Sequence, residues 1–146
     1  MGAYVRAKTY DPALVLCSTA TRAKETLKLV LPALGAAPEI RYERALYLAE
    51  WPQLLEEIRG LAGAASPLLL VGHNPGLEQL AIALALQPQS VAERARLQKL
   101  AQKYPAGALA VLDFETKDWA GVKPGRGRLI DFAKPKDFPG AKAEDE

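Results

Sequence analysis

The sequence predicts an α/β fold in three layers, with helices on both faces of a mostly parallel sheet and an antiparallel pair of strands near the carboxyl end. Two short, continuous apolar runs, Leu14–Leu16 and Leu68–Val71, are typical of strands covered on both faces. Segments with apolar residues at three- and four-residue steps alternate with these runs, and this alternation favours a sheet wrapped by helices. We expect residues 1–133 to form a single domain and residues 134–146 to form a flexible, charged tail.

Five strands are expected. The first apolar run predicts a strand that ends at Cys17, and the run that ends at Gly72 is the clearest strand signal in the chain. The two late segments are expected to pair antiparallel through a Gly-rich turn that contains Trp119. The expected strands are Pro12–Cys17, Glu39–Arg41, Ser66–Gly72, Ala106–Glu115 and Arg126–Phe132.

Four longer helices and one short helical piece are expected between the strands. Apolar residues from Leu27 to Leu34 share one face of the first long helix, and Gly35 stops it. Pro52 fits the first turn of the second, where its missing N–H group costs nothing. The expected helical segments are Met1–Lys8, Thr19–Leu34, Trp51–Leu61, Pro75–Leu86 and Val91–Lys103.

Composition excludes several classes of protein. The net charge of +2 is too small to indicate a nucleic-acid partner. No apolar run approaches the roughly 20 residues of a membrane span, and the amino terminus has no secretory signal. The single cysteine, Cys17, cannot form an internal disulfide, which fits a reducing compartment. We therefore expect a cytoplasmic protein with no membrane or nucleic-acid partner.

His73 is the only histidine in the chain and follows a predicted strand directly. Gly72 allows close approach of the backbone, and the turn Asn74–Gly76 leads into a helix whose free N–H groups favour anions. An imidazole at such a point can donate to a phosphoryl oxygen or move a proton near neutral pH. The alternative is a histidine that caps the helix or is hydrogen-bonded in the core.

Arg22 stands at the start of the first long helix, among hydroxyl side chains that include Ser18. An arginine fork, a hydroxyl group and free backbone amides together suit a phosphate group. The alternative is an ordinary solvated arginine. Because Ser18 and His73 both follow strands, and ligands bind at the carboxyl ends of strands in such sheets, we expect the three side chains to converge on one anion site.

Other kinds of site are not indicated. Cys17 ends an apolar strand with no base beside it in the sequence, so we interpret it as a buried structural thiol rather than a nucleophile. One histidine and one cysteine cannot build the usual metal sites. The chain has no phosphate-binding P-loop and no dinucleotide fingerprint. No metal or cofactor is expected.

The chain resembles the histidine phosphatase superfamily, which has the phosphoglycerate mutase-like fold, and within it the small SixA-type phosphohistidine phosphatases. The resemblance covers nearly the whole chain and depends on the order and spacing of several segments. These segments are Leu14–Thr26, Leu69–Gly76, Tyr104–Leu112 and Arg128–Phe132.

The resemblance implies a role for each of the predicted site residues. In the family a first strand ends in Arg-His-Gly, and its histidine attacks the phosphoryl group. Carried over, Arg22 is the second phosphate-binding arginine, His73 is the second, phosphate-stabilising histidine, and Ser18 lines the pocket. Many relatives use a glutamate as proton donor. Glu50 is the nearest candidate here, although an exposed residue before a helix is its more ordinary interpretation.

The Arg-His-Gly sequence occurs nowhere in the chain, and there is no second histidine. Two explanations compete: a start placed at an internal methionine, which we favour, and a degenerate family member. In the family the missing first strand lies between the strands that match Pro67–Gly72 and Ala106–Glu115. Without it, these two strands either close on each other or are covered by a second copy in a homodimer, and we favour the homodimer.

The resemblance implies phosphohistidine phosphatase activity on a signalling or phosphotransfer protein, with the chain as given inactive because the nucleophilic histidine is absent. One alternative is a phosphatase for a small phosphoester, as in other branches of the superfamily. Another is a non-catalytic module that binds phosphate or a partner protein, which the missing nucleophile favours.

Overall fold

A three-stranded parallel sheet forms the centre of the fold in the computed structural model, which describes residues 11–34 and 37–134. Strand β1 (Leu14–Ser18) lies between β2 (Glu39–Glu43) and β3 (Leu68–Val71) and pairs parallel with both. Strands β4 (Leu109–Phe114) and β5 (Gly127–Ala133) pair antiparallel in a second sheet. The predicted α/β class, with its parallel part and its antiparallel carboxyl-terminal part, is confirmed.

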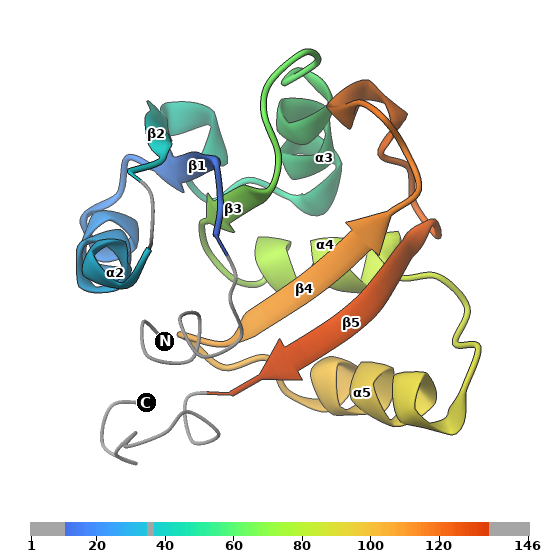
Figure 1. The fold of residues 1–146 in the computed structure, drawn as a ribbon. Helices are drawn as coiled ribbons and strands as arrows, with labels where there is room; N and C mark the ends of the chain where they lie inside the picture. The colour runs from blue at the N-terminus through green and yellow to red at the C-terminus, as the bar shows by residue number, and fades with distance from the viewer. Residues whose placement is uncertain (1–10, 35–36, 135–146) are drawn as a thin grey trace.

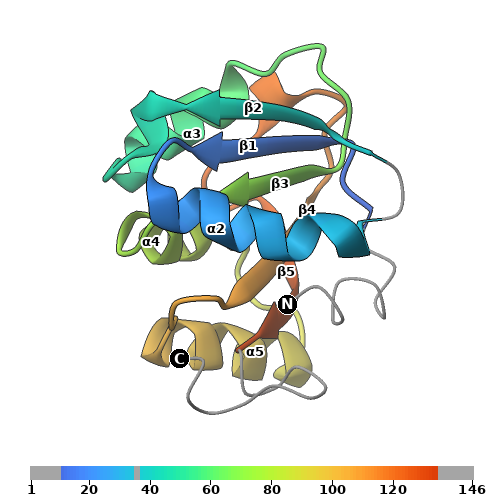
Figure 2. The same ribbon diagram turned by 90° about the vertical axis from the view of Figure 1, so that its left-hand side faces the viewer.

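Helices cover both faces of the parallel sheet (Figure 2). Their bounds are close to those predicted, with three single turns of 3-10 helix between them. The helices are α2 (Thr21–Val30), α3 (Trp51–Arg59), α4 (Gly76–Leu84) and α5 (Val91–Gln102), and the 3-10 turns are η1 (Leu31–Ala33), η2 (Arg44–Leu46) and η3 (Trp119–Gly121).

The alternation of side chains along β1 divides the core between the two faces of the sheet. Val15 and Cys17 point to one face and pack with the buried face of α2. Leu14 and Leu16 point to the other face and pack with α3 and α4. All five residues of β1 are buried, as expected for the central strand of a sheet covered on both faces.

The antiparallel pair forms a separate layer with α5 (Figure 1). Leu100 of α5 packs against Leu129 and Phe132 of β5, and Ala81 of α4 joins the same cluster. The end of α4 is also attached to the start of β5, because the Leu86 N–H group donates to the Gly127 oxygen at 2.6 Å. Helix α4 therefore contacts both sheets.

The single continuous sheet that the sequence suggested is divided in the structure. In the described part of the chain β3 pairs only with β1, and β4 pairs only with β5. In the described residues β3 and β4 therefore do not pair with each other. The four residues of β3 are only half-buried, whereas their apolar run predicted full burial, because one edge of the strand has no neighbouring strand.

The first long helix is shorter at both ends than Thr19–Leu34. Ala20 is in an extended conformation, so the helix begins at Thr21. Beyond Val30 the chain tightens into the 3-10 turn η1, where Pro32 lacks the N–H group that a regular helix would use. The expected helical piece Met1–Lys8, the expected stop at Gly35 and residues 135–146 of the expected tail lie outside the described residues.

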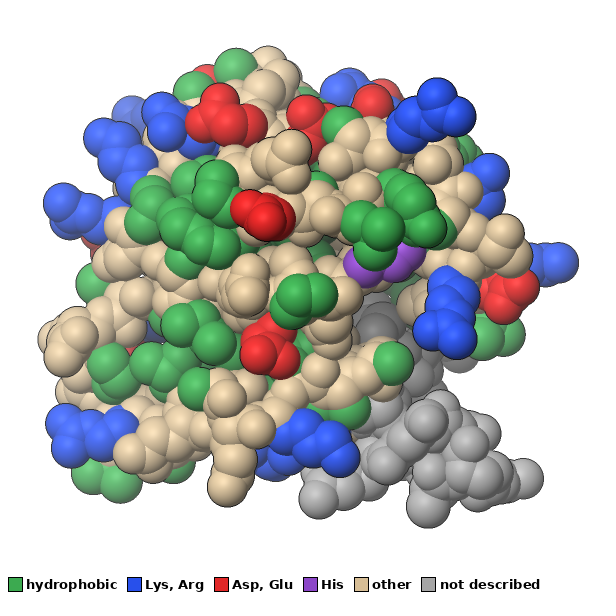
Figure 3. Space-filling model, turned by 180° about the vertical axis from the view of Figure 1, so that it is seen from behind, with side chains coloured by type: hydrophobic (Ala, Val, Ile, Leu, Met, Phe, Trp, Pro, Cys, Tyr) green, Lys and Arg blue, Asp and Glu red, His purple; other side chains and the backbone are tan. Residues whose placement is uncertain are grey.

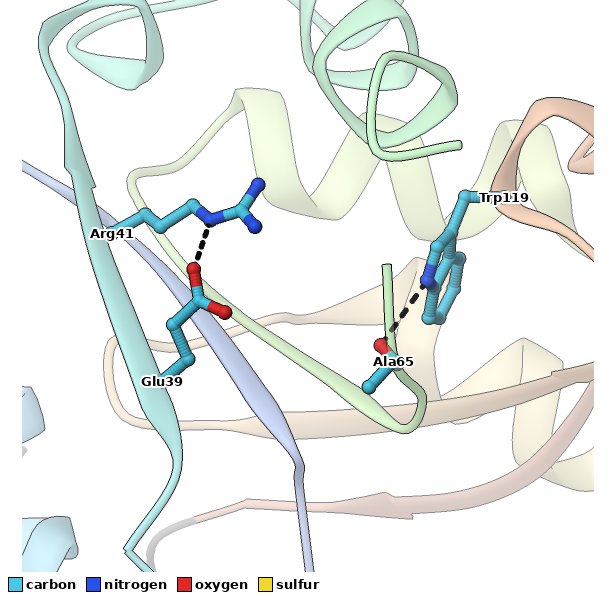
Figure 4. A network of polar contacts seen from close by, with 4 residues as sticks. All are labelled: Glu39, Arg41, Ala65 and Trp119. Atoms are coloured by element: carbon cyan, nitrogen blue, oxygen red, sulfur yellow. Dashed lines mark hydrogen bonds and ion pairs between the residues drawn. The ribbon is translucent and has the colours of Figure 1, made fainter. Parts of the chain in front are cut away.

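Polar contacts fix the chain around the parallel sheet (Figure 4). The Trp119 indole N–H group donates to the Ala65 oxygen at 3.3 Å, and this contact holds the segment that leads into β3. On β2, Arg41 and Glu39 form an exposed ion pair along one strand face. A pair this exposed contributes little to stability. The indole contact therefore has the clearer structural role, at the end of β3 opposite His73.

Candidate functional site

Ser18 and His73 meet at the carboxyl edge of the parallel sheet. Ser18 is the last residue of β1, and His73 follows β3 after Gly72. A hydrogen bond of 2.8 Å joins His73 Nε2 to Ser18 Oγ, although the two residues are 55 positions apart in the sequence. The parallel pairing of the two strands places both ends at the same edge. The predicted convergence of these two residues is thus found.

Ser18 is completely buried. Its Oγ also accepts a hydrogen bond from the Ala20 N–H group at 3.2 Å, which fixes the hydroxyl at the turn between β1 and α2. A hydroxyl held in this way orients the imidazole ring of His73. In the structure the Ser18 hydroxyl is hydrogen-bonded to His73. Its direct contact with a phosphate remains a prediction.

His73 does not cap the following helix with its side chain. Its backbone oxygen accepts from the Leu77 N–H group at 2.9 Å, while its ring turns back to Ser18. The Tyr47 ring stands edge-on to the imidazole, with 5.5 Å between the ring centroids. In the space-filling view the histidine, purple, lies at the surface beside a group of hydrophobic side chains (Figure 3). Its ring is therefore fixed on two sides and remains half-exposed to a ligand.

Asn74 fixes the turn that carries His73. Its Nδ2 donates to the Tyr104 oxygen at 2.8 Å, and its Oδ1 accepts from the Glu78 N–H group at 3.3 Å in the first turn of α4. Tyr104 is itself well anchored, because its ring packs on Phe132. Burial raises the pKa of its hydroxyl to about 12. The contact therefore ties the histidine turn to the segment that precedes β4.

Arg22 lies in the first turn of α2 and is exposed. Among Ser18, Arg22 and His73 the only hydrogen bond in the structure is the one between Ser18 and His73. Thr26 donates to the backbone oxygen of Arg22 at 3.0 Å and does not hold its side chain. The structure thus leaves the guanidinium outside the Ser18–His73 pair, and its binding of phosphate remains a prediction.

A cavity of about 230 Å³ adjoins His73. It lies between the loop that precedes α3 and the turn that begins α4. Of the described residues on its wall, Glu50 is the one acidic or basic side chain other than the histidine. The residues that line the cavity are Leu48, Ala49, Glu50, His73, Asn74, Pro75, Gly76 and Gln79.

Glu50 thus lines the same cavity as His73, and it also precedes α3 as its N-cap, where its N–H group donates to Gln53 Oε1 at 3.1 Å. Its proximity to the histidine was not evident from the sequence, where 22 other residues separate them. Tyr47, Leu48 and Gln79 were missed entirely. No periodicity or motif marks them, since the fold alone brings the loop before α3 and helix α4 together.

Cys17 has the properties of a structural thiol. It is fully buried, its S–H group donates to the Ser18 oxygen at 3.3 Å, and burial raises its pKa. A raised pKa leaves little of the reactive thiolate near neutral pH. Cys17 is therefore unsuited to act as a nucleophile.

Within residues 11–34 and 37–134, no group of three or more His, Cys, Asp or Glu side chains is placed to hold a metal ion. The helices of the same ranges are all too short or too polar to cross a membrane.

Known structures with this fold include histidine phosphatases. The chain is similar to a protein of Nakamurella multipartitia designated phosphohistidine phosphatase SixA, with a TM-score of 0.72, 26% identity and coverage of 92% of this chain and 77% of the other. For a protein of Agrobacterium tumefaciens with the same designation, the TM-score is 0.70 and the identity 28%, over 92% of this chain and 75% of the other. The protein histidine phosphatase SixA in complex with tungstate shares the fold at 16% identity, with a TM-score of 0.70 over 94% of this chain and 78% of the other. The fold is therefore that of the SixA-like histidine phosphatases.

Relatives in sequence come from mycobacteria. The chain is 36% identical to an uncharacterized protein of Mycobacterium tuberculosis over 135 residues, which is 92% of this chain and 81% of the relative. It is 30% identical to an uncharacterized protein of Mycobacterium leprae over 131 residues, which is 88% of this chain and 76% of the relative. No protein-family profile matches the chain. The chain belongs to the same family as these mycobacterial proteins.

Proposed function

We propose that this chain carries the phosphate-stabilising part of a SixA-type phosphohistidine phosphatase site. Its substrate is then the phosphohistidine of a signalling or phosphotransfer protein, and the reaction takes place in the cytoplasm. The Ser18–His73 hydrogen bond at the carboxyl edge of the sheet is the observation that carries the proposal. The similarity to structures designated phosphohistidine phosphatases supports the same class of reaction.

In this proposal His73 stabilises the phosphoryl group and does not attack it. Covalent transfer needs an attacking group as well as preorganised donors to the phosphoryl oxygens. The chain contains one histidine, and Ser18 already engages its Nε2 atom. We therefore propose that a polypeptide of these 146 residues lacks appreciable phosphatase activity. The Arg-His-Gly sequence of the family is the part that these 146 residues do not contain.

A second candidate function is a non-catalytic module that binds phosphate or a phosphorylated partner. It is favoured by the presence of a single histidine in the chain, which leaves no second histidine to act as the nucleophile. The coding sequence upstream of Met1 separates the two: an in-frame Arg-His-Gly strand supports an enzyme, and a stop codon immediately upstream supports the module. A small-phosphoester phosphatase is the third candidate, and the relative rates on phosphohistidine and on phosphoesters test it once an active form is made.

Anion binding tests the part of the site that this chain contains. We expect inorganic phosphate to bind weakly, with chemical-shift changes at His73 and at the start of α2. Arg22→Ala should raise the Kd for phosphate about 5- to 10-fold, because a charge-assisted contact is lost. Arg22→Lys should raise it less, since lysine keeps the charge but loses the planar fork.

Arg59→Ala provides the matched control, because Arg59 is an exposed arginine at the opposite end of α3 from the cavity. The Kd of the Arg59→Ala variant for phosphate should equal that of the unmodified chain. Equal effects of Arg22→Ala and Arg59→Ala would show that Arg22 supplies only general charge. No phosphate binding to the unmodified chain at millimolar concentrations would overturn the proposed site.

Within the described residues, β3 and β4 each have an open edge, and this leads us to propose a homodimer for the 146-residue polypeptide. An apolar strand with one unpaired edge exposes N–H and C=O groups that another chain can pair with or cover. Light scattering at micromolar concentration should then give twice the chain mass of 15.8 kDa. A monomer whose Leu68–Val71 amides exchange slowly with solvent would contradict the dimer.

A further inference from the structure

Leu48 has an unusual backbone conformation beside the site. Its φ angle is 54°, and no other non-glycine residue in the described part of the chain has a positive φ. Leucine rarely adopts this left-handed conformation, which suits glycine or asparagine better. The side chain is nevertheless 67% exposed, so burial in the core does not offset the cost. An exposed apolar side chain in a strained conformation points to a role in contact with a ligand.

The loop around Leu48 is held firmly in place. Its neighbours Leu46 and Ala49 are buried on either side. The Ala49 N–H group donates to the Leu46 oxygen at 3.3 Å, and the Tyr47 N–H group donates to the Arg44 oxygen at 3.0 Å. The exposure of Leu48 is therefore imposed by an ordered loop.

Tyr47 and Leu48 together form an apolar rim beside His73, which we call the Tyr47–Leu48 rim. Tyr47 is 54% exposed and its ring stands edge-on to the imidazole, while Leu48 lines the adjoining cavity. Hydrophobic side chains border the histidine at the molecular surface (Figure 3). A ligand held at His73 would therefore meet an apolar surface on this side.

The charge of the cavity indicates which part of a ligand it can receive. Among the described residues, its wall includes the Glu50 carboxylate and the polar groups of Asn74 and Gln79, but no lysine or arginine. A carboxylate without a cation disfavours a phosphate group and favours a neutral or positively charged group that can donate a hydrogen bond. The cavity and its rim therefore suit the group that bears the phosphate.

We propose that the Tyr47–Leu48 rim and the adjoining cavity bind the imidazole ring and flanking residues of a phosphohistidine in a protein substrate, with Leu48 as a specificity-determining residue. The proposal rests on the proposed function. The ring of phosphohistidine is flat and partly apolar, and its second nitrogen donates an N–H group when the ring is protonated, so it matches an aromatic and aliphatic rim with a carboxylate behind it. A sugar phosphate presents hydroxyl groups on most sides and matches this surface poorly.

The test compares binding of three probes to the chain by calorimetry or NMR titration. The probes are inorganic phosphate, a peptide with phosphoryltriazolylalanine (a stable analogue of phosphohistidine) and the same peptide without the phosphoryl group. Leu48→Asn removes the apolar contact and keeps a residue that tolerates positive φ. We expect it to raise the Kd for the phosphorylated peptide about 5- to 10-fold, as for loss of most of one leucine contact, and to leave the Kd for phosphate unchanged.

Leu29→Asn is the matched control, because Leu29 is 81% exposed on α2. It should change neither Kd. The thermal midpoint of Leu48→Asn should equal or exceed that of the unmodified chain, since backbone strain is relieved. A phosphorylated peptide that binds no tighter than phosphate, or equally well to Leu48→Asn, would overturn this inference alone. If the unmodified chain bound neither inorganic phosphate nor the phosphorylated peptide, the proposed function would be overturned as well.

Discussion

Joining a strand that ends in Arg-His-Gly to the amino terminus of the chain is expected to raise phosphohistidine hydrolysis on the order of 10⁴-fold or more above that of the 146-residue polypeptide. Loss of a nucleophile from a preorganised site typically has an effect of this size. The remaining parts of the site, His73 and the turn that begins α2, are already fixed by hydrogen bonds. The measurement is release of phosphate from a chemically phosphorylated histidine protein.

The control for that experiment is the same extension with glutamine in place of its histidine. It should fold like the active form and release no more phosphate than the 146-residue chain. Turnover by the 146-residue chain itself, with a phosphorylated His73 trapped as an intermediate, would contradict the prediction. Such a result would make His73 the nucleophile and would require it to leave Ser18 during the reaction.

Gly76→Ala is expected to lower the free energy of unfolding by about 2–3 kcal/mol, an effect typical of overpacking against fixed atoms. A Cβ atom at Gly76 would collide with the backbone oxygen of Ala49, which cannot rotate away. The start of α4 would have to move, and the His73 turn would move with it. Urea denaturation followed by circular dichroism measures the change.

Gly72→Ala is the matched control, four residues earlier on the same side of the sheet. A Cβ atom there would lie 3.6 Å from Leu77 Cδ2, an ordinary van der Waals contact. We expect its effect to stay below about 1 kcal/mol. Equal effects of the two substitutions would mean that the loop before α3 yields easily, and that the tight fit at Gly76 does not stabilise the site.

The parallel part of the fold could be predicted from the sequence because its signals are local. Continuous apolar runs predicted β1 and β3, and helical spacing predicted α3 and α5 with small errors at their ends. The division into two sheets could not be predicted in this way. Whether β3 has a neighbour on its second edge depends on partners distant in sequence, and the same apolar run fits a central strand and an edge strand equally well.

The candidate site could also be predicted only in part. His73 and Ser18 follow strand signals, so their meeting at one edge of the sheet followed from the parallel topology. The direction of the Arg22 side chain did not follow, because a helix position fixes a Cα atom and leaves a long, exposed side chain free. The left-handed Leu48 had no signal at all, since leucine at such a position is contrary to its own conformational preference.

The place of α4 in the molecule couples the site to the second sheet. In the described part of the chain the two sheets share no ladder of hydrogen bonds, and α4 runs from the His73 turn at one end to the start of β5 at the other. Asn74 adds a link from the same turn to Tyr104. Binding equilibria that share one structural element are reciprocal, so a ligand that stabilises the His73 turn also stabilises the docking of the antiparallel pair. By the same linkage, we expect a segment that pairs with the edge of β3 left open among the described residues to alter anion affinity at His73 without contacting the anion.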